Sequence, residues 1–278
     1  MRLTSSVPQH HSSAHAAPVH HDAAKSKGPT DFKVGSFNVL GASHTAPGGN
    51  KASRPSGVER MKLAAQAIQQ HKLDVVGFQE FEPSQRKAFM HDTKNQFAMY
   101  PGTHGGADPV NSIAWRKDKF EFVKGTHVTV PYFEGHKKQM PVVLLKNKET
   151  GQKMWVMNVH NPADTKNHPH NEKNRDIATA KEIAFIKHLE KKTGYPVIMT
   201  GDMNEKAEAR QHITQGTDMK TAMSGKNSHS HSVGIDWIFG SPNVHFDGYD
   251  RDASNKVQRA SDHPLVYSNV HIPAGKKT

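Results

Sequence analysis

The chain has 278 residues, and its 37 Lys and Arg against 26 Asp and Glu give a formal net charge of +11. It contains no cysteine, which excludes a disulfide framework, thiolate metal sites and cysteine nucleophiles. No apolar run approaches the roughly 18 residues needed to cross a bilayer, so we expect no integral membrane association.

The first 31 residues are rich in histidine and poor in large apolar side chains. Such a segment cannot offset its ordering entropy by burial, so residues 1–31 are predicted to be a disordered tail. Its histidines could alternatively capture a transition metal; they are His10, His11, His15, His20 and His21. The segment lacks the apolar centre of a secretory signal, which makes a cytoplasmic location the default expectation and leaves secretion open.

After this tail the chain begins with a β-α-β pattern. Residues 32–40 alternate and are rich in β-formers, which predicts a strand. Residues 58–72 carry apolar side chains at helical spacing, and residues 74–78 return to the short apolar run of a buried strand.

Strands and helices continue to alternate along the rest of the chain. A second helix is expected over residues 83–94, and the clearest helix over residues 171–192, where Asn171 takes the cap position and Gly194 follows as a stop signal. The remaining predicted strands are 112–115, 126–133, 142–146, 154–159, 196–200, 235–239 and 265–270. The second to fourth of these are spaced closely enough to form an antiparallel meander.

The mixture of elements predicts a single folded unit. We find no internal repeat and no Gly/Ser linker, which indicates one α/β domain of layered sheets and helices over residues 32–272. Residues 273–278 form a short basic tail, and we expect the protein to act as a monomer.

Polar side chains follow directly where several of the apolar runs end. They are Asn38, Glu80, His160, Asn161, Asp202, Asn204, Asp236, Asp262 and His263. Strand ends on one edge of a sheet are where α/β proteins assemble their sites. Any one such residue taken singly is more often a turn former or a helix cap. Turns do not require a glutamate at 80 or a Ser-Asp-His run at 261–263, so the set together predicts a functional site.

Three of these residues suit a hard divalent cation. Mg²⁺ prefers carboxylate and amide oxygens and keeps several waters, so Glu80 and Asp262, with Asn38, could hold one ion and leave room for a phosphate oxygen. The sequence therefore points to a metal that acts as a Lewis acid on a phosphate ester.

The other residues suit proton transfer at the same ester. Imidazoles exchange protons or contact phosphate near neutral pH, and Asp236 could fix the tautomer of His263 and stabilise its charged form. Asp202 and Asn204 could orient the attacking water.

In these motifs the chain resembles the endonuclease/exonuclease/phosphatase superfamily, which includes deoxyribonuclease I, abasic-site endonucleases, deadenylases, sphingomyelinases and inositol polyphosphate phosphatases. The motifs stand in the family's order: SFNVL, FQE, NSIAWRKDKF, NVHNPA, TGDMN, IDWIF and SDHPLV. The resemblance implies an α/β fold, a four-layer sandwich of two packed mixed β-sheets flanked by helices. It also implies metal-dependent hydrolysis of phosphoester bonds, with Mg²⁺ or Mn²⁺ as the cofactor.

The resemblance also implies residue roles. Glu80 would be the metal ligand, with Asn38 and Asp262 near the ion. Met203 replaces a residue that is commonly aromatic in the family, which should alter packing rather than chemistry. Arg116 matches a frequent family position, although it could equally be an ordinary surface charge.

The catalytic roles follow in the same way. His263, oriented by Asp236, would activate water or stabilise the phosphorane. Asp202 and Asn204 would position the nucleophile and the phosphate, and His160 would contact the phosphate or assist the leaving oxygen.

The charge distribution favours a polyanionic substrate. Residues 1–31 have a net charge of +1, which leaves +10 on the remaining residues. A basic catalytic domain attracts nucleic acid through counterion release and steering, so a nuclease acting on DNA or RNA is the first hypothesis. The loop after His160 adds further cations that could contact flanking phosphates or simply be solvated; they are Lys166, His168, His170, Lys173 and Arg175.

Two other functions remain open from the sequence. The first is a phospholipid (sphingomyelinase-like) or inositol-phosphate phosphoesterase, because basic surfaces also dock on anionic membranes. Against it, the sequence contains no long apolar hairpin or basic amphipathic helix. The second is a binding protein without catalysis, which the complete residue set disfavours.

Overall fold

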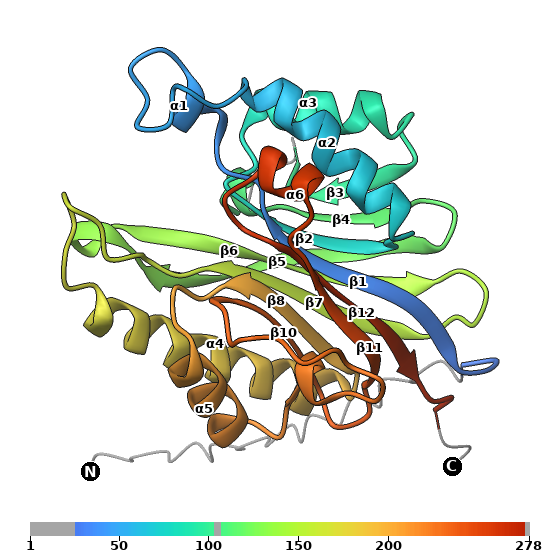
Figure 1. Cartoon of the computed structure of the whole chain (residues 1–278). Coiled ribbons are helices and arrows are strands. Elements are labelled where there is room, and N and C mark those ends of the chain that lie inside the picture. The colour runs from blue at the N-terminus through green and yellow to red at the C-terminus, as the bar shows by residue number, and fades with distance from the viewer. Residues whose placement is uncertain (1–25, 103–106, 276–278) are drawn as a thin grey trace, which may run out of the picture.

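The computed structural model describes residues 26–102 and 107–275. Two six-stranded sheets pack face to face, with helices on both outer sides, so the chain forms four layers (Figure 1). This arrangement confirms the predicted four-layer α/β sandwich. The histidines predicted to lie in the tail fall outside the described residues, while Lys27 and Thr30 already bond to Thr150 of the fold.

The first sheet has the strand order β11-β12-β1-β2-β4-β3. Its strands are β1 (Thr30–Asn38), β2 (Val75–Gln79), β3 (Phe97–Tyr100), β4 (Ile113–Arg116), β11 (His245–Asp252) and β12 (Leu265–Ile272). Strands β1 and β2 are parallel, whereas β12 runs antiparallel to β1. The end of β1, the end of β2 and the start of β12 therefore lie at one edge.

The second sheet has the order β5-β6-β7-β8-β10-β9. Its strands are β5 (Phe120–Pro131), β6 (Lys137–Asn147), β7 (Lys153–His160), β8 (Val197–Asp202), β9 (Lys220–Thr221) and β10 (Asp236–Gly240). Strands β5, β6 and β7 form the predicted antiparallel meander. Strands β7 and β8 are parallel, and β10 is antiparallel to β8.

The helices cover the two outer faces. They are α1 (Ala42–Thr45), α2 (Gly57–Gln70), α3 (Pro83–Asp92), α4 (Glu172–Thr193), α5 (Ala207–Gly216) and α6 (Asn255–Ala260), with short 3-10 turns η1 (Pro109–Asn111), η2 (Phe133–Gly135) and η3 (Ala222–Ser224). Helices α2, α3 and α6 lie on the first sheet, and α4 and α5 lie on the second (Figure 1). A capping box of Ser56 and Glu59 begins α2, and Gly194, at a φ of 68°, ends α4. No helix in the described residues is long and apolar enough to cross a membrane.

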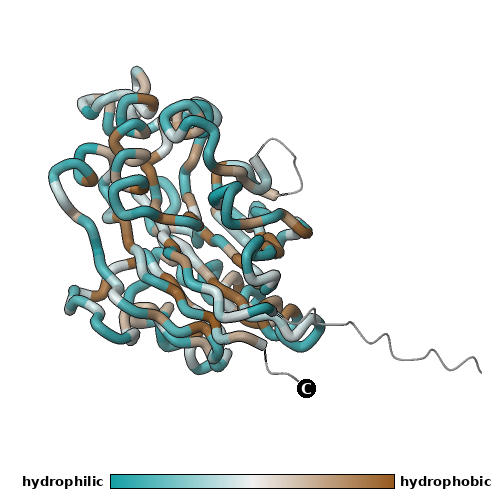
Figure 2. The backbone as a smooth tube through the Cα atoms, turned by 90° about the vertical axis from the view of Figure 1, so that its right-hand side faces the viewer, coloured by the Kyte–Doolittle hydropathy of each residue, from teal (hydrophilic) through white to brown (hydrophobic). Residues whose placement is uncertain are grey.

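Three apolar clusters fill the spaces between the four layers. One lies between the sheets and includes Val34, Val75, Val156 and Ile198. The other two join each sheet to its own helices. The apolar segments run along the strands, and polar stretches lie mainly in the connections between them (Figure 2). Polar side chains where the strands end are therefore held by a packed core.

Several elements differ from the sequence prediction. Strands β3, β9 and β11 and helices α1, α5 and α6 were not expected, and β5 begins six residues before the predicted start. Strand β11 carries charged residues on its exposed side and a bulge between Asp247 and Asp250, so it lacks a clear apolar period. Elements β3, β9, α1 and α6 are too short to show periodicity, whereas α5 was missed although it is as long as α3.

The sheets approach each other closely at Gly77 in β2. A Cβ atom at this position would overlap Thr200 Oγ1 and the side-chain amide of Asn158 on the opposite sheet. Asn158 Nδ2 crosses the interface to donate to the Phe78 carbonyl at 2.7 Å, and its Oδ1 accepts from Gln79 Nε2 at 2.6 Å. These polar contacts fix the spacing and register of the two sheets directly behind the strand ends.

We expect Gly77→Ala to lower the free energy of unfolding by about 1–3 kcal/mol, because the added methyl forces apart groups in a close-packed interface. Gly28→Ala is the matched control, since nothing lies within 4 Å of a Cβ there. Urea denaturation followed by circular dichroism measures both. Equal stability of the two variants would contradict a tight contact at Gly77.

Candidate active site

The predicted site residues come together at one end of the sandwich. Both sheets contribute to it, because the parallel pairs β1/β2 and β7/β8 end there. The residues brought together are Asn38, Glu80, His160, Asp202, Asn204, Asp236, Asp262 and His263. The sheet register pairs Asp202 with His160 on one side and with Asp236 on the other.

Asn38 connects the two halves of the site. Its side chain is fully buried, and Nδ2 donates to Glu80 Oε1 at 2.9 Å and to Asp202 Oδ2 at 3.0 Å. Its Oδ1 accepts from the backbone N–H of Leu40 at 3.0 Å. Asn38 therefore acts in this geometry as a donor that orients two carboxylates.

Glu80 follows β2 in the left-handed backbone region, with a φ of 57°. Its Oε2 accepts from Gly41 N at 2.9 Å and lies 3.2 Å from His44 Nε2. Burial opposes ionisation, but the hydrogen bond from His44, the charge of His160 and the bonds from Asn38 and Gly41 together hold the pKa of Glu80 well below its usual range. The carboxylate is thus charged at neutral pH.

A loop between β1 and α2 supplies two cations that sequence reasoning missed. His44 contacts Glu80, and Lys51 forms an ion pair with Asp262. The hydrogen bond to Glu80 outweighs burial and raises the pKa of His44 to about 9. A histidine and a lysine within a Gly-rich stretch directly after the SFNVL motif were the available sequence signal.

The donor set is compatible with a divalent metal. Glu80 and Asp262 are charged oxygen donors that already attract cations, as a site for a hard divalent ion requires. Atoms of Asp202, Asp236 and His263 also lie within 4.8 Å of one another, a spacing that a metal could use. The first group suits a hard ion such as Mg²⁺ better, because His263 is engaged by Asp236 and Mg²⁺ favours oxygen over imidazole.

Two imidazoles flank the Asp202 carboxylate. His160 Nε2 lies 3.5 Å and His263 Nε2 lies 3.7 Å from Asp202 Oδ2. His263 Nδ1 lies 3.0 Å from Asp236 Oδ1, which fixes the ring and leaves Nε2 directed toward Asp202. Burial disfavours the imidazolium, but the carboxylates of Asp236, Asp202 and Asp262 outweigh it and raise the pKa of His263 to about 10.

The TGDMN turn positions the remaining predicted residue. Asn204 adopts a φ of 51°, a region that asparagine tolerates. Its backbone N–H donates to Asp202 Oδ1 at 3.0 Å, and its Nδ2 donates to the Asn161 carbonyl at 2.8 Å. Met203 points into the core that joins the second sheet to α4 and α5. These bonds join the turns after β7 and β8.

A buried carboxyl supports these turns from behind. Glu182 on α4 is fully buried, and its Oε2 accepts from Asn161 Nδ2 at 3.5 Å. Burial, opposed by this bond and reinforced by the charge of Glu205, raises the pKa of Glu182 to about 8. The sequence signal was a glutamate on the otherwise mainly uncharged buried side of a long helix.

Two arginines singled out from the sequence lie elsewhere. Arg116 pairs with Asp118 at 2.6 Å at the end of β4 that is far from Glu80. Arg175 is buried and bonds to Asp164 and Glu205, both at 3.1 Å. The expectation that Arg175 could contact flanking phosphates is therefore wrong, because its guanidinium is consumed by structural ion pairs.

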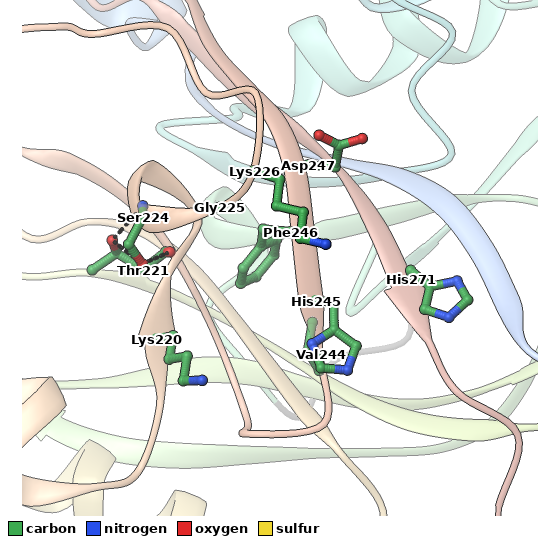
Figure 3. A pocket seen from close by; sticks show the side chains of 10 residues that line it. All are labelled: Lys220, Thr221, Ser224, Gly225, Lys226, Val244, His245, Phe246, Asp247 and His271. Atoms are coloured by element: carbon green, nitrogen blue, oxygen red, sulfur yellow. Dashed lines mark hydrogen bonds between the residues drawn. The ribbon is translucent and has the colours of Figure 1, made fainter.

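Two cavities lie away from the candidate active site. Lys220, Lys226, His245 and His271 line one of about 470 Å³ (Figure 3). His271 is near the far end of β12 from His263, about 25 Å along the strand. The second, of about 870 Å³, lies beside β3 and is lined mainly by apolar side chains. Neither includes a predicted catalytic residue.

We expect the raised pKa of Glu182 to be visible in how the free energy of unfolding depends on pH. Its pKa is about 8 in the folded chain against an ordinary 4.5, so the folded state binds more protons between these values. The free energy of unfolding should therefore fall as the pH rises from about 5 to 8, on the order of a few kcal/mol. Glu182→Gln should remove this contribution, whereas Glu149→Gln, at an exposed site, should retain it. Urea titrations at several pH values measure this, and parallel profiles for the two variants would refute it.

Comparison with known proteins places the fold. The chain matches the model of the Endonuclease/Exonuclease/phosphatase family over residues 35–263. A Bacteroides thetaiotaomicron protein of this family superposes with a TM-score of 0.71 at 20% identity, covering 88% of this chain and 98% of its own. The B. thetaiotaomicron mannosyl-6-phosphatase gives 0.68 at 21%, covering 86% and 99%.

A third similar structure is D. rerio TDP2 complexed with a single-strand DNA product, with a TM-score of 0.60 at 16% identity, covering 87% of this chain and 99% of that chain. At these identities the structures support the fold alone. No curated protein matches the sequence significantly. The family match extends from β1 to the His263 motif, and the chain therefore belongs to the endonuclease/exonuclease/phosphatase family.

Proposed function

We propose that the protein is a divalent-metal-dependent phosphodiesterase, and specifically a nuclease that hydrolyses DNA or RNA by attack of water on phosphorus. The observation that carries this is a series of contacts: Asn38 donates hydrogen bonds to both Glu80 and Asp202, and the imidazole of His263 lies 3.7 Å from the Asp202 carboxylate. The carboxylate of Glu80, which would bind the metal, and the imidazole of His263, which would act in proton transfer, therefore lie on opposite sides of Asn38 and Asp202.

Glu80 and Asp262 would hold the metal, and Asn38 would keep Glu80 oriented through its 2.9 Å bond. Mg²⁺ or Mn²⁺ bound there would act as a Lewis acid on a phosphoryl oxygen. His44 and Lys51 would have to yield their contacts with the two carboxylates to a metal ion.

The remaining groups would act on the water and the phosphate. Asp202, held by Asn38 and by Asn204 N–H, would orient the attacking water. His263, kept charged by Asp236, would stabilise the extra negative charge on phosphorus, and His160 would contact the phosphate or the leaving oxygen.

The nuclease assignment is supported by charge. The residues after the tail carry +10, and one similar structure contains a single-strand DNA product. The alternative is a phospholipid or inositol-phosphate phosphoesterase. Phosphate monoesters are also substrates to test, because one of the similar structures is a mannosyl-6-phosphatase. We propose that the protein works as a monomer.

We expect EDTA to abolish hydrolysis, and Glu80→Gln and His263→Ala each to lower kcat by at least about 100-fold, because each removes a group that acts on the reacting phosphate. Arg116→Ala is the matched control, since its ion pair lies at the opposite end of β4. Steady-state kinetics with Mg²⁺ and Mn²⁺ measure this. Activity that survives EDTA or both substitutions would overturn the mechanism.

We expect cleavage of plasmid, single-stranded DNA or RNA, with a rate under subsaturating substrate that falls steeply as salt rises. Sphingomyelin, inositol phosphates and a sugar phosphate are the competing substrates. Hydrolysis confined to a lipid or a phosphate monoester, with little salt dependence, would refute the nuclease assignment and promote the alternative.

A further inference from the structure

A separate cavity of about 350 Å³ adjoins the candidate active site. Its lining includes Asp262 and His263 of the candidate site, together with Arg54, Arg251 and Gln258. Arg54 comes from the loop before α2, and Arg251 comes from the end of β11. We propose that this cavity binds a second phosphoryl group of the substrate, next to the one that is hydrolysed.

The two guanidiniums are available for a ligand. Neither forms an ion pair with a carboxylate of the described residues. Arg54 Nη1 donates only to the backbone carbonyl of Gln258, at 3.0 Å. Arg251 Nε is buried and has no hydrogen-bond partner in the described part of the chain. The Arg251 side chain donates no hydrogen bond within the described residues, so no protein acceptor holds its guanidinium, and an anion in the cavity would supply one.

The carboxylates closest in sequence to Arg251 are engaged by other groups. Asp250 Oδ1 lies 2.7 Å from His231 Nε2, and Asp252 Oδ2 lies 2.8 Å from His71 Nε2. Asp262, which lines the cavity, is paired with Lys51. The cavity therefore presents two guanidiniums that form no ion pair in the described residues, and one carboxylate that is already paired with Lys51.

Other basic side chains near the site already form ion pairs. His44 and Lys51 contact the metal-binding carboxylates, and Arg175 is held by two ion pairs. Arg54 and Arg251, by contrast, form no ion pair in the described residues and are placed to meet an incoming anion beside His263. Guanidinium forms paired, charge-assisted hydrogen bonds with phosphate oxygens, which makes arginine well suited to this ligand.

The inference rests on the proposed function and narrows its substrate. A site that holds one phosphate at His263 and a second at the two arginines fits a strand of linked phosphodiesters. A diester with a single phosphate would fill only the first position. The chemistry at Arg54 and Arg251 therefore favours a nucleic acid over a lipid headgroup with one phosphate.

Kinetics on paired substrates test the subsite. Bis(p-nitrophenyl) phosphate offers one phosphate, while short single-stranded oligonucleotides offer several. We expect Arg54→Gln and Arg251→Gln each to raise KM for the oligonucleotide about tenfold, with kcat and the turnover of the one-phosphate diester little changed. Lysine at either position should recover part of the loss, because it keeps the charge without the planar fork.

Binding without turnover gives a second measurement. In EDTA, fluorescence anisotropy of a labelled oligonucleotide should show weaker binding by both variants. The slope of log K against log salt should become shallower by about 0.7 for each lost phosphate contact. Lys220→Gln and Lys226→Gln, which remove charge at the distant cavity, are the matched controls (Figure 3).

The outcomes separate the two proposals. If the wild type cleaves oligonucleotides but the arginine variants match the distant lysine variants, the subsite is refuted and the nuclease stands. Equal loss on both substrates also refutes it, because that points to damage at the reacting centre. If the wild type cleaves no nucleic acid, the nuclease and the subsite fall together. Thermal melting of each variant identifies any loss that is due to unfolding.

Discussion

The close contact between the sheets at Gly77 is the constraint on which the site depends. Only a residue without a side chain lets Asn158 and Thr200 of the second sheet approach β2 so closely. Asn158 then bonds to the backbone of the first sheet and to Gln79, one residue before Glu80. The two halves of the site come from different sheets, so the distance between Glu80 and Asp202 is set by this packing rather than by either loop.

The electrostatics follow from that distance. Asn38 fits between Glu80 and Asp202 and donates to both, so one amide orients two carboxyl groups, and its bond to Glu80 helps to hold the pKa of Glu80 low. His263 stays protonated because three carboxylates surround it in a largely buried place. Glu182 lies behind these residues, and burial raises its pKa to about 8. It therefore accepts the hydrogen bond from Asn161 mainly as a neutral carboxylic acid at pH 7.

Much of the fold and of the site was predictable because its signals are local. Apolar periods mark β1, β2, β7 and β8, and His160 and Asp202 are the last residues of β7 and β8. The features that the sequence did not reveal depend on partners far along the chain. They are the raised pKa of Glu182, the ion pair of Lys51 with Asp262, and the hydrogen bond from Asn158 to the opposite sheet. Strand β11 was missed because its exposed side is charged and its pairing is interrupted by a bulge.

The buried Arg60 on α2 bears on how variants of this protein should be interpreted. Its guanidinium is fully enclosed and donates to the carbonyls of Val39, Leu40 and Ala260 at 2.7, 2.6 and 2.9 Å. It therefore ties the backbone just after Asn38 to the backbone just before the SDH motif. A substitution at Arg60 would therefore disturb the segments that carry Asn38 and Asp262 at the same time, although Arg60 itself is fully buried. If substitution of Arg60 lowers activity, the loss therefore reports on the position of these two backbone segments and not on contact with the substrate.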